Sequence, residues 1–237
     1  MITTVFFDLD GTLLPMDQEV FLNAYMGGLA QKMAPYGYEP KTLIKNIWKG
    51  TGAMVMNDGS ARNDEVFWKT FSALCGRDVM ADEAVFIEFY QNEFQNVAKV
   101  CGFDPRAAET VRYIKERGMK VVLATNPLFP AIATHSRAKW AGLDPDDFEY
   151  ITTYENSFHC KPNPDYYREI LGKMNLKPEE CLMVGNDAVE DAAAEKLGMR
   201  VFLLTDCLIN KTGEDISKYP NGSFEELREY IRGASQQ

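Results

Sequence analysis

The sequence lacks several features that would place it in a familiar functional class. Its 237 residues carry a formal net charge of -10, so no basic excess favours nucleic acid or an anionic membrane as a partner. No apolar run approaches the roughly 20 residues that span a bilayer. The first residues contain no basic leader, and Asp8 interrupts their apolar run, so we expect no signal peptide.

The five cysteines and two histidines are too few and too scattered to predict a disulfide scaffold or a metal site. The five cysteines include no C-x-x-C pair, which indicates reduced thiols and neither a disulfide scaffold nor a zinc site. Neither of the glycine motifs that cradle nucleotide phosphates, G-x-x-x-x-G-K-[ST] and G-x-G-x-x-G, occurs. These absences predict a cytoplasmic protein without such a nucleotide cradle.

The chain does contain β-rich apolar runs that alternate with helical patterns. The runs are TTVFFDLDG, KVVLATNP, FEYITTYE, CLMVGND and RVFLLTD, and helical patterns occupy 106–117, 130–142, NPDYYREILGKMNL and AVEDAAAEKLGM. Buried parallel strands are apolar on both faces, as these are. We predict an α/β fold with a Rossmann-like parallel sheet in three α/β/α layers, ending in a surface loop and a closing helix.

Residues 16–100 follow a different pattern, with several amphipathic helical segments and no clear strand. Aromatic residues recur there at helical spacing, for example Phe67 and Phe71, or Phe86 and Phe94, and such stripes usually form a bundle core. We predict a helical cap domain over 16–100, inserted into a core domain of 1–15 plus 101–237. The stretch 51–60 (TGAMVMNDGS) is interpreted as a loop between two cap helices and as a candidate specificity element.

Polar residues suited to phosphate chemistry follow the predicted strands. In an open parallel sheet, ligands bind beyond the carboxyl ends of the strands, so residues distant in sequence are expected to converge there. The set comprises Asp8, Asp10, Thr125, Asn126, Lys161, Asn186, Asp187 and Asp191.

This set has the chemistry of a magnesium-assisted phosphoryl-transfer site. Asp8, Asp10 and the Asn186/Asp187 pair are hard oxygen donors of the kind that Mg²⁺ prefers. A carboxylate can form an acyl phosphate when a metal ion and a lysine make the phosphorus electrophilic. Lys161, the Thr125 hydroxyl and backbone amides after Asp8 can supply positioning and charge neutralisation.

The motifs DLDGTLL, LATN, KPNP and VGNDAVED, in that order, resemble the four motifs of the haloacid dehalogenase superfamily of phosphohydrolases. The resemblance covers the whole chain, including a helical cap inserted after the first motif. It implies a Mg²⁺-dependent phosphohydrolase that acts on a small phosphorylated metabolite, a phosphomonoester, through an aspartyl-phosphate intermediate. The cap is expected to close over the site and exclude bulk water.

The resemblance also implies a role for each motif residue. Asp8 would be the nucleophile and a metal ligand. Asp10 would act as general acid and then general base, with its backbone carbonyl on the metal. Thr125 and Asn126 would hold the phosphoryl oxygens, and Lys161 would neutralise the charge on Asp8 and phosphate. An acid at Asp10 implies phosphoryl chemistry, because the metal-independent dehalogenases of the family lack it.

The fourth motif departs from the family pattern, which has an acid directly after the glycine. Here Gly185 is followed by Asn186 and then Asp187. Either residue can supply the metal ligand, and we favour Asp187 because of its charge. Asp191 is expected to brace the backbone or the ligands rather than to bind metal.

Other functions were weighed against this one. A phosphomutase of the same superfamily would use the same residues but return the phosphoryl group to a sugar. A phospho-accepting receiver domain also places acids, Thr and Lys at strand ends, but it lacks the inserted cap. An EF-hand loop starting at Asp8 would need glycine where Leu13 stands. A monomer and a homodimer are both compatible with the sequence.

Overall fold

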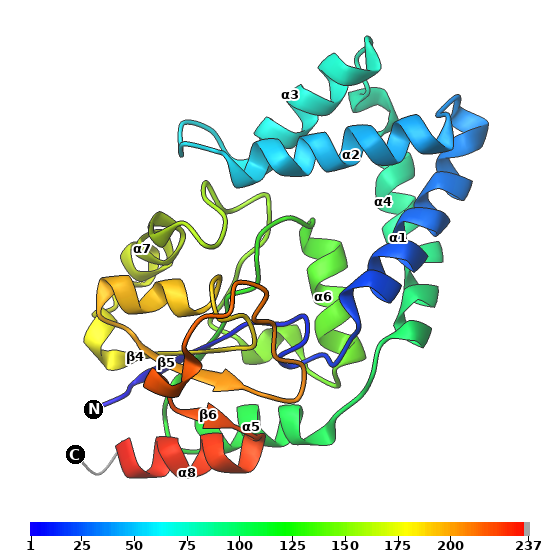
Figure 1. Ribbon diagram of the computed structural model, residues 1–237. Coiled ribbons are helices and arrows are strands. Elements are labelled where there is room, and N and C mark those ends of the chain that lie inside the picture. The colour runs from blue at the N-terminus through cyan, green and yellow to red at the C-terminus, as the bar shows by residue number, and fades with distance from the viewer. Residues whose placement is uncertain (235–237) are drawn as a thin grey trace.

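A six-stranded sheet forms the centre of the computed structural model, which describes residues 1–234 (Figure 1). The strand order is β3-β2-β1-β4-β5-β6, and every neighbouring pair is parallel. The strands are β1 (Thr4–Phe7), β2 (Lys120–Leu123), β3 (Tyr150–Ile151), β4 (Cys181–Gly185), β5 (Arg200–Leu204) and β6 (Asn221–Gly222). The five predicted strands are therefore present, and the strand that carries the first motif lies between β2 and β4.

The two-residue strand β6 lies within the predicted surface loop; most of that loop is irregular and exposed, but the prediction missed the strand. Backbone bonds from Leu203 N–H to Pro220 O (3.0 Å) and from Thr205 N–H to Gly222 O (3.0 Å) attach this segment to β5. The segment has a proline and a glycine but no apolar run, so its sequence carries no strand pattern. The closing helix, α8 (Phe224–Ala234), was predicted correctly.

Helices cover both faces of the sheet, as the near-continuous apolar strands predicted. Val5 and Phe7 of β1 pack with α5 (Pro105–Lys115), α6 (Ala131–Trp140) and α8. Phe6 faces the other way and packs with α7 (Pro164–Met174) and a 3₁₀ helix (Ala192–Leu197). This arrangement confirms the three-layer α/β/α core.

The fourth predicted core helix, over AVEDAAAEKLGM, is shorter than expected. Only Ala192–Leu197 is helical, and it is a 3₁₀ helix. The Asp187 carboxylate accepts from the N–H groups of Val189 and Glu190 at 2.8 Å, which holds this segment in a turn. Side-chain acceptors of this kind compete with helical hydrogen bonds.

Residues 18–100, here called the helical module, stand beside the sheet (Figure 1). They form α1 (Gln18–Met33), α2 (Pro40–Val55), α3 (Asn63–Cys75), α4 (Glu83–Gln91) and a 3₁₀ helix (Glu93–Val100). The predicted aromatic core exists, because Phe71, Phe86, Phe89 and Phe94 are all buried in one cluster.

The two chain crossings between the module and the sheet lie side by side. Met16 forms an antiparallel bridge with Cys101, and Gly102 N–H donates to Pro15 O at 2.7 Å. The predicted domain boundaries, 15/16 and 100/101, fall at this double crossing. A short paired connection of this kind is a natural place for a hinge.

The stretch 51–60 is not a single loop, which corrects the sequence-based expectation. Its first five residues complete α2, and Asn57 then ties the chain to the start of α3 by donating to Ala61 O (2.8 Å) and Asn63 Oδ1 (2.9 Å). Of this stretch only Thr51 lines either of the cavities described below.

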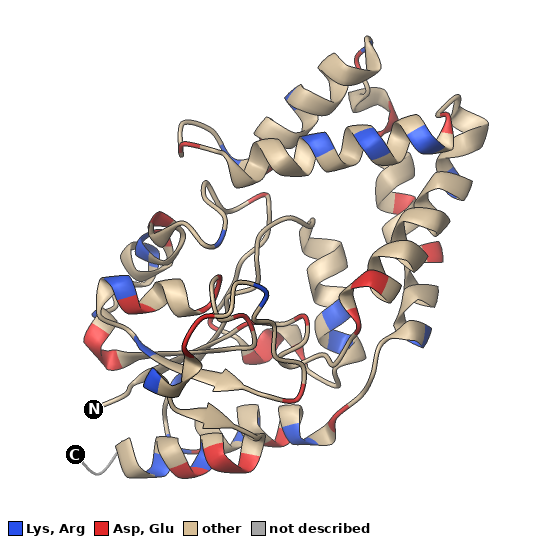
Figure 2. Cartoon of the chain, in the orientation of Figure 1, with Lys and Arg blue, Asp and Glu red and all other residues tan. Residues whose placement is uncertain are grey.

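Charged positions are distributed over all layers of the molecule (Figure 2). Helices α7 and α8 carry charges of both signs, whereas the charged residues of α2 are all lysines (Figure 2). Within residues 1–234, none of the helices has both the length and the apolar character needed to cross a membrane.

Candidate active site

The first motif forms a tight turn at the carboxyl end of β1. Leu9 O accepts from the backbone N–H groups of Thr12, Leu13 and Leu14, which folds the chain back on itself. Gly11 has φ +84°, and a Cβ there would lie 2.3 Å from Asn186 Nδ2. Glycine is needed because only it accepts this dihedral angle and leaves room for the fourth motif.

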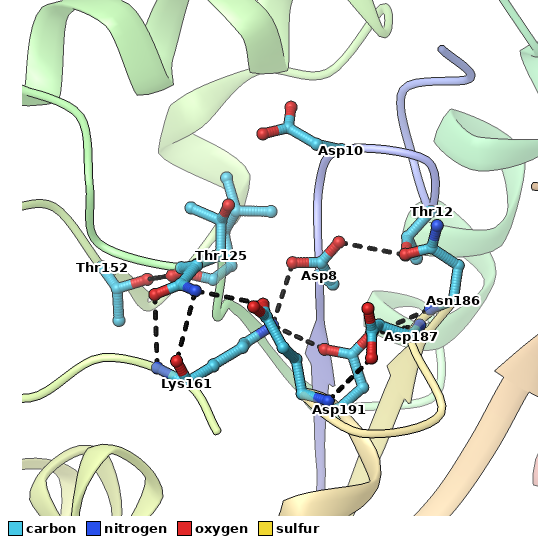
Figure 3. Close-up of polar contacts among 12 residues, drawn as sticks. Asp8, Asp10, Thr12, Thr125, Thr152, Lys161, Asn186, Asp187 and Asp191 are labelled. Carbon is cyan, nitrogen blue, oxygen red and sulfur yellow. Dashed lines mark hydrogen bonds and ion pairs between the residues drawn. The ribbon is translucent and has the colours of Figure 1, made fainter. Parts of the chain in front are cut away.

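Lys161 joins the first and fourth motifs by a buried double ion pair (Figure 3). Its Nζ lies 2.9 Å from Asp8 Oδ1 and 2.6 Å from Asp191 Oδ1, and the lysine is 1% exposed. Burial alone would lower the pKa of Lys161, but Asp191 and Asp8 hold it well above its usual value. Lys161 is therefore a permanent positive charge beside Asp8.

Asp191 braces the fourth motif, as expected from the sequence. Its Oδ2 accepts from the N–H groups of Asn186 and Asp187, both at 2.9 Å, while its Oδ1 pairs with Lys161. One carboxylate thus fixes both a backbone turn and the lysine that contacts Asp8. Asp191 borders the cavity but is 1% exposed, and both of its carboxylate oxygens already have partners within the protein.

The side chains of Asn186 and Asp187 point to different partners. Asn186 Oδ1 lies 3.1 Å from Thr12 Oγ1, and the same hydroxyl lies 3.2 Å from Asp8 Oδ2. Thr12 has one hydroxyl proton, so at any moment it serves only one of these two oxygens. Two acceptor oxygens that share one proton are chemically suited to a cation, and which of Asn186 and Asp187 would bind a metal stays a prediction.

Thr125 and Asn126 lie at the end of β2, beside Lys161. No hydrogen bond involves the Thr125 hydroxyl within the part of the chain that the structure describes, and this residue lines the same cavity as Asp8. The Asn126 amide instead accepts from Lys161 N–H (3.2 Å) and donates to Glu190 Oε2 (3.0 Å). Its side chain therefore holds two loops together, and its expected contact with phosphate stays a prediction.

Asp10 pairs with a residue that sequence reasoning missed. Its Oδ2 forms an ion pair with the guanidinium of Arg137 on α6, which is completely buried and stacks on Phe129 with 4.3 Å between guanidinium carbon and ring centre. The Asp10 carboxylate points away from Asp8 (Figure 3). No sequence signal marks Arg137, because it sits in a helix 127 positions from its partner.

A cavity of about 260 Å³ opens over these residues. Its floor includes Asp8, Asp10 and Thr125, and its apolar wall includes Phe21 and Phe129. Burial raises the pKa of Asp8 to about 7, although Lys161 opposes the rise, and Asp191 and Asp10 add to it. The site thus holds more buried negative charge than Lys161 alone offsets.

The oxygen atoms around Asp8 suit a magnesium ion. Among residues 1–234 no group of three or more His, Cys, Asp or Glu side chains is arranged to hold a metal. The converging donors are instead one carboxylate oxygen, of Asp8, and one amide oxygen, of Asn186. Mg²⁺ commonly takes few protein carboxylates and completes its shell with water or substrate phosphate, so this donor set fits it.

Comparison with known proteins agrees with this geometry. The family model of haloacid dehalogenase-like hydrolases matches residues 2–198. Pyrophosphatase PpaX of Bacillus cereus (strain ATCC 10987 / NRS 248) is 25% identical over 199 residues, which cover 84% of this chain and 81% of that protein.

Solved structures share the fold over nearly the whole chain. A HAD phosphatase from Thermococcus onnurineus superposes with a TM-score of 0.60 at 19% identity, covering 97% of this chain and 98% of the other. An L-2-haloacid dehalogenase from Xanthobacter autotrophicus superposes with a TM-score of 0.59 at 15% identity, covering 98% of this chain and 99% of the other. Because the family model spans most of the sequence, the chain belongs to the haloacid dehalogenase-like hydrolases and is a phosphatase-like enzyme of that family.

Proposed function

We propose that the chain is a Mg²⁺-dependent phosphohydrolase that cleaves a small phosphomonoester through an aspartyl-phosphate on Asp8. The observation that carries this proposal is the Asp8 carboxylate, which borders the cavity while Lys161 holds one of its oxygens at 2.9 Å. A fixed carboxylate beside a fixed positive charge is arranged for nucleophilic attack on a phosphoryl group.

In the first step, an Asp8 oxygen attacks phosphorus and the bond from phosphorus to the leaving-group oxygen breaks. Lys161 and the free Thr125 hydroxyl offset the charge on the phosphoryl oxygens. Asp10 donates a proton to the leaving oxygen, for which its side chain must turn from Arg137 toward Asp8. The products of this step are the free alcohol and the acyl phosphate.

In the second step, water attacks the phosphorus of the acyl phosphate. Asp10 takes the water's proton, the bond between Asp8 and phosphorus breaks, and phosphate leaves. Asp8 is then regenerated as a carboxylate. Residues 16–100 are proposed to act as the cap domain that limits water access during both steps, since Phe21 of α1 forms part of the cavity wall.

Mg²⁺ would be held by Asp8, the Asn186 amide oxygen and the backbone carbonyl of Asp10. When bound, it polarises the phosphoryl group and neutralises charge that Lys161 alone does not offset. Asp187 is assigned a different task, because its Oδ1 accepts two backbone N–H groups at 2.8 Å and so stabilises the turn that precedes the 3₁₀ helix.

Phosphate release from a panel of phosphomonoesters tests the proposal. We expect activity with Mg²⁺, loss of activity in EDTA, and loss of at least 10³-fold in kcat for Asp8→Asn, on the order expected for a removed nucleophile. Acid-quenched enzyme should carry labelled phosphate on Asp8. Activity that survives both EDTA and Asp8→Asn would refute the mechanism, and label returning to a sugar hydroxyl would indicate a phosphomutase.

A further inference from the structure

A second, apolar cavity adjoins the site and has no role in the steps described so far. Its volume is about 90 Å³, several times the roughly 10–15 Å³ that one water molecule needs. It lies between α1, α2, α3 and α4 and is closed on one side by the loop after β2.

This cavity is adjacent to the one over Asp8. The two cavities share four lining residues, which are Leu22, Trp48, Leu128 and Phe129. Phe129 also carries the stacked Arg137 guanidinium, which pairs with Asp10. The boundary between the two cavities therefore lies close to Asp10, the proposed proton donor to the leaving group.

The walls of the apolar cavity offer little to a charged ligand. Glu83 is the only charged residue among those that line it, and it is acidic. The hydroxyls of Tyr25 and Tyr90 are 2.8 Å apart and bond to each other. Burial raises the pKa of Tyr25 to about 12, so the hydroxyl remains neutral at physiological pH.

The structure also leaves apolar surface uncovered here. Trp48 is 48% exposed and Ile87 is 41% exposed, and both line this cavity. Exposed large apolar side chains around a cavity are typical of a ligand site.

We propose that this cavity receives the apolar, uncharged leaving group of the substrate, so that the enzyme prefers phosphomonoesters of alkyl or single-ring alcohols. The inference rests on the proposed function and narrows its substrate class. An anionic leaving group, such as the phosphate of pyrophosphate or the glycolate of 2-phosphoglycolate, would meet Glu83 and no cation within the cavity.

A series of n-alkyl phosphates tests the proposal, because their leaving groups have nearly equal intrinsic reactivity. Each methylene moved from water into an apolar site is worth about fourfold, so we expect kcat/KM to rise about 15-fold from ethyl to butyl phosphate, which differ by two methylenes. Butyl phosphate should also exceed 2-phosphoglycolate and pyrophosphate. Equal kcat/KM across the alkyl series, with activity present, overturns the inference and leaves the proposed function standing.

Matched variants locate the effect. Ile87→Asp puts a charge on the cavity wall and should lower kcat/KM for butyl phosphate more than for ethyl phosphate. Val55→Asp is the control, because Val55 is 39% exposed on α2 and lines neither cavity. If Ile87→Asp does not fold, the kcat/KM values of the wild-type enzyme for the n-alkyl phosphates decide the proposal.

Binding provides a readout that does not require turnover. Titration calorimetry of the Asp8→Asn chain should show butyl phosphate binding about 15-fold more tightly than ethyl phosphate. If no ester is hydrolysed but this difference is present, the proposed function fails while the apolar site stands. Equal affinities contradict the apolar site.

Discussion

The two aspartates of the first motif have opposite electrostatic surroundings, although only Leu9 separates them. Asp8 shares Lys161 with Asp191, so two buried carboxylates compete for one ammonium group. Asp10 forms an ion pair with Arg137, and the Asp10 side chain is 22% exposed. Substitution of each by asparagine should therefore change stability in opposite directions.

Asp8→Asn should stabilise the metal-free protein at alkaline pH. Folding raises the pKa of Asp8 from 3.8 to about 7. The contribution of Asp8 to the free energy of unfolding is therefore fully present below its unfolded pKa and is lost as the pH rises through about 7. Asparagine removes this loss. We expect a gain of about 1–2 kcal/mol, or about 2–8 °C in Tm, at pH 8 and a smaller gain at pH 5.

Thermal unfolding in EDTA at the two pH values measures this difference. If the Asp8→Asn variant melts at or below the wild-type Tm at pH 8, ionised Asp8 does not destabilise the folded protein in solution.

Asp10→Asn should instead destabilise the protein. It leaves the completely buried Arg137 guanidinium without its carboxylate, and a broken buried pair typically costs about 3–5 kcal/mol. The double variant Asp10→Asn/Arg137→Met removes the unpaired charge at similar volume and should recover most of this loss without restoring activity. Urea unfolding measures both. An Asp10→Asn variant as stable as the wild type would mean that the pair does not form in solution.

At the scale of helices and strands, the start of α3 anchors the helical module to the catalytic loops. Asn63 Nδ2 lies 3.4 Å from both Pro127 O and His159 O, and Asn63 N–H donates to Ser157 O at 2.9 Å. These carbonyls belong to the segments that follow Asn126 and precede Lys161. Movement of the module is thus coupled to both segments.

Asn63→Ala should loosen this anchor. The side chain is fully buried, so its loss leaves buried partners unsatisfied, at about 1–3 kcal/mol. Hydrogen exchange of the backbone amides of residues 63–75 should become faster. Asn23→Ala is the control, because Asn23 is exposed on α1, and it should change the free energy of unfolding by less than about 0.5 kcal/mol. Unchanged exchange in Asn63→Ala would remove the anchoring role.

Helix α2 forms although its sequence is not typical of a stable helix. Gly50 and Gly52 lie in its interior, and glycine lowers helix propensity. The structure supplies the reason for one of them, because a Cβ on Gly50 would lie 2.8 Å from the Phe67 ring. Close packing between α2 and α3 thus outweighs the local preference.

For the whole molecule, bound Mg²⁺ should act as a stabiliser, because a ligand that binds only the folded state raises Tm. At about ten times its dissociation constant, the gain is about 1.4 kcal/mol, or about 3–6 °C. Asp187→Asn should keep this shift, since its amide oxygen still accepts in the turn, whereas Asn186→Ala should lose most of it. Thermal melts with and without Mg²⁺ measure both variants, and the reverse pattern would assign the ligand to Asp187.

The order of the motifs and the layers of the core were predictable because neighbouring residues encode them. Asp8, Thr125 and Asn186 each follow an apolar run directly, and the carboxyl ends of parallel strands meet at one edge, so their convergence follows from local patterns. The family resemblance of the same motifs then indicated the chemistry.

The partners of these residues were not predictable in the same way. Arg137 beside Asp10, Glu190 beside Asn126 and the apolar cavity within the helical module depend on helices that meet only after the chain has folded. Hydrophobic periodicity records which face of a helix is buried, but not which residue of another helix it will contact. For that reason the type of reaction can be inferred from short motifs, whereas the shape of the leaving-group site depends on how the helices pack.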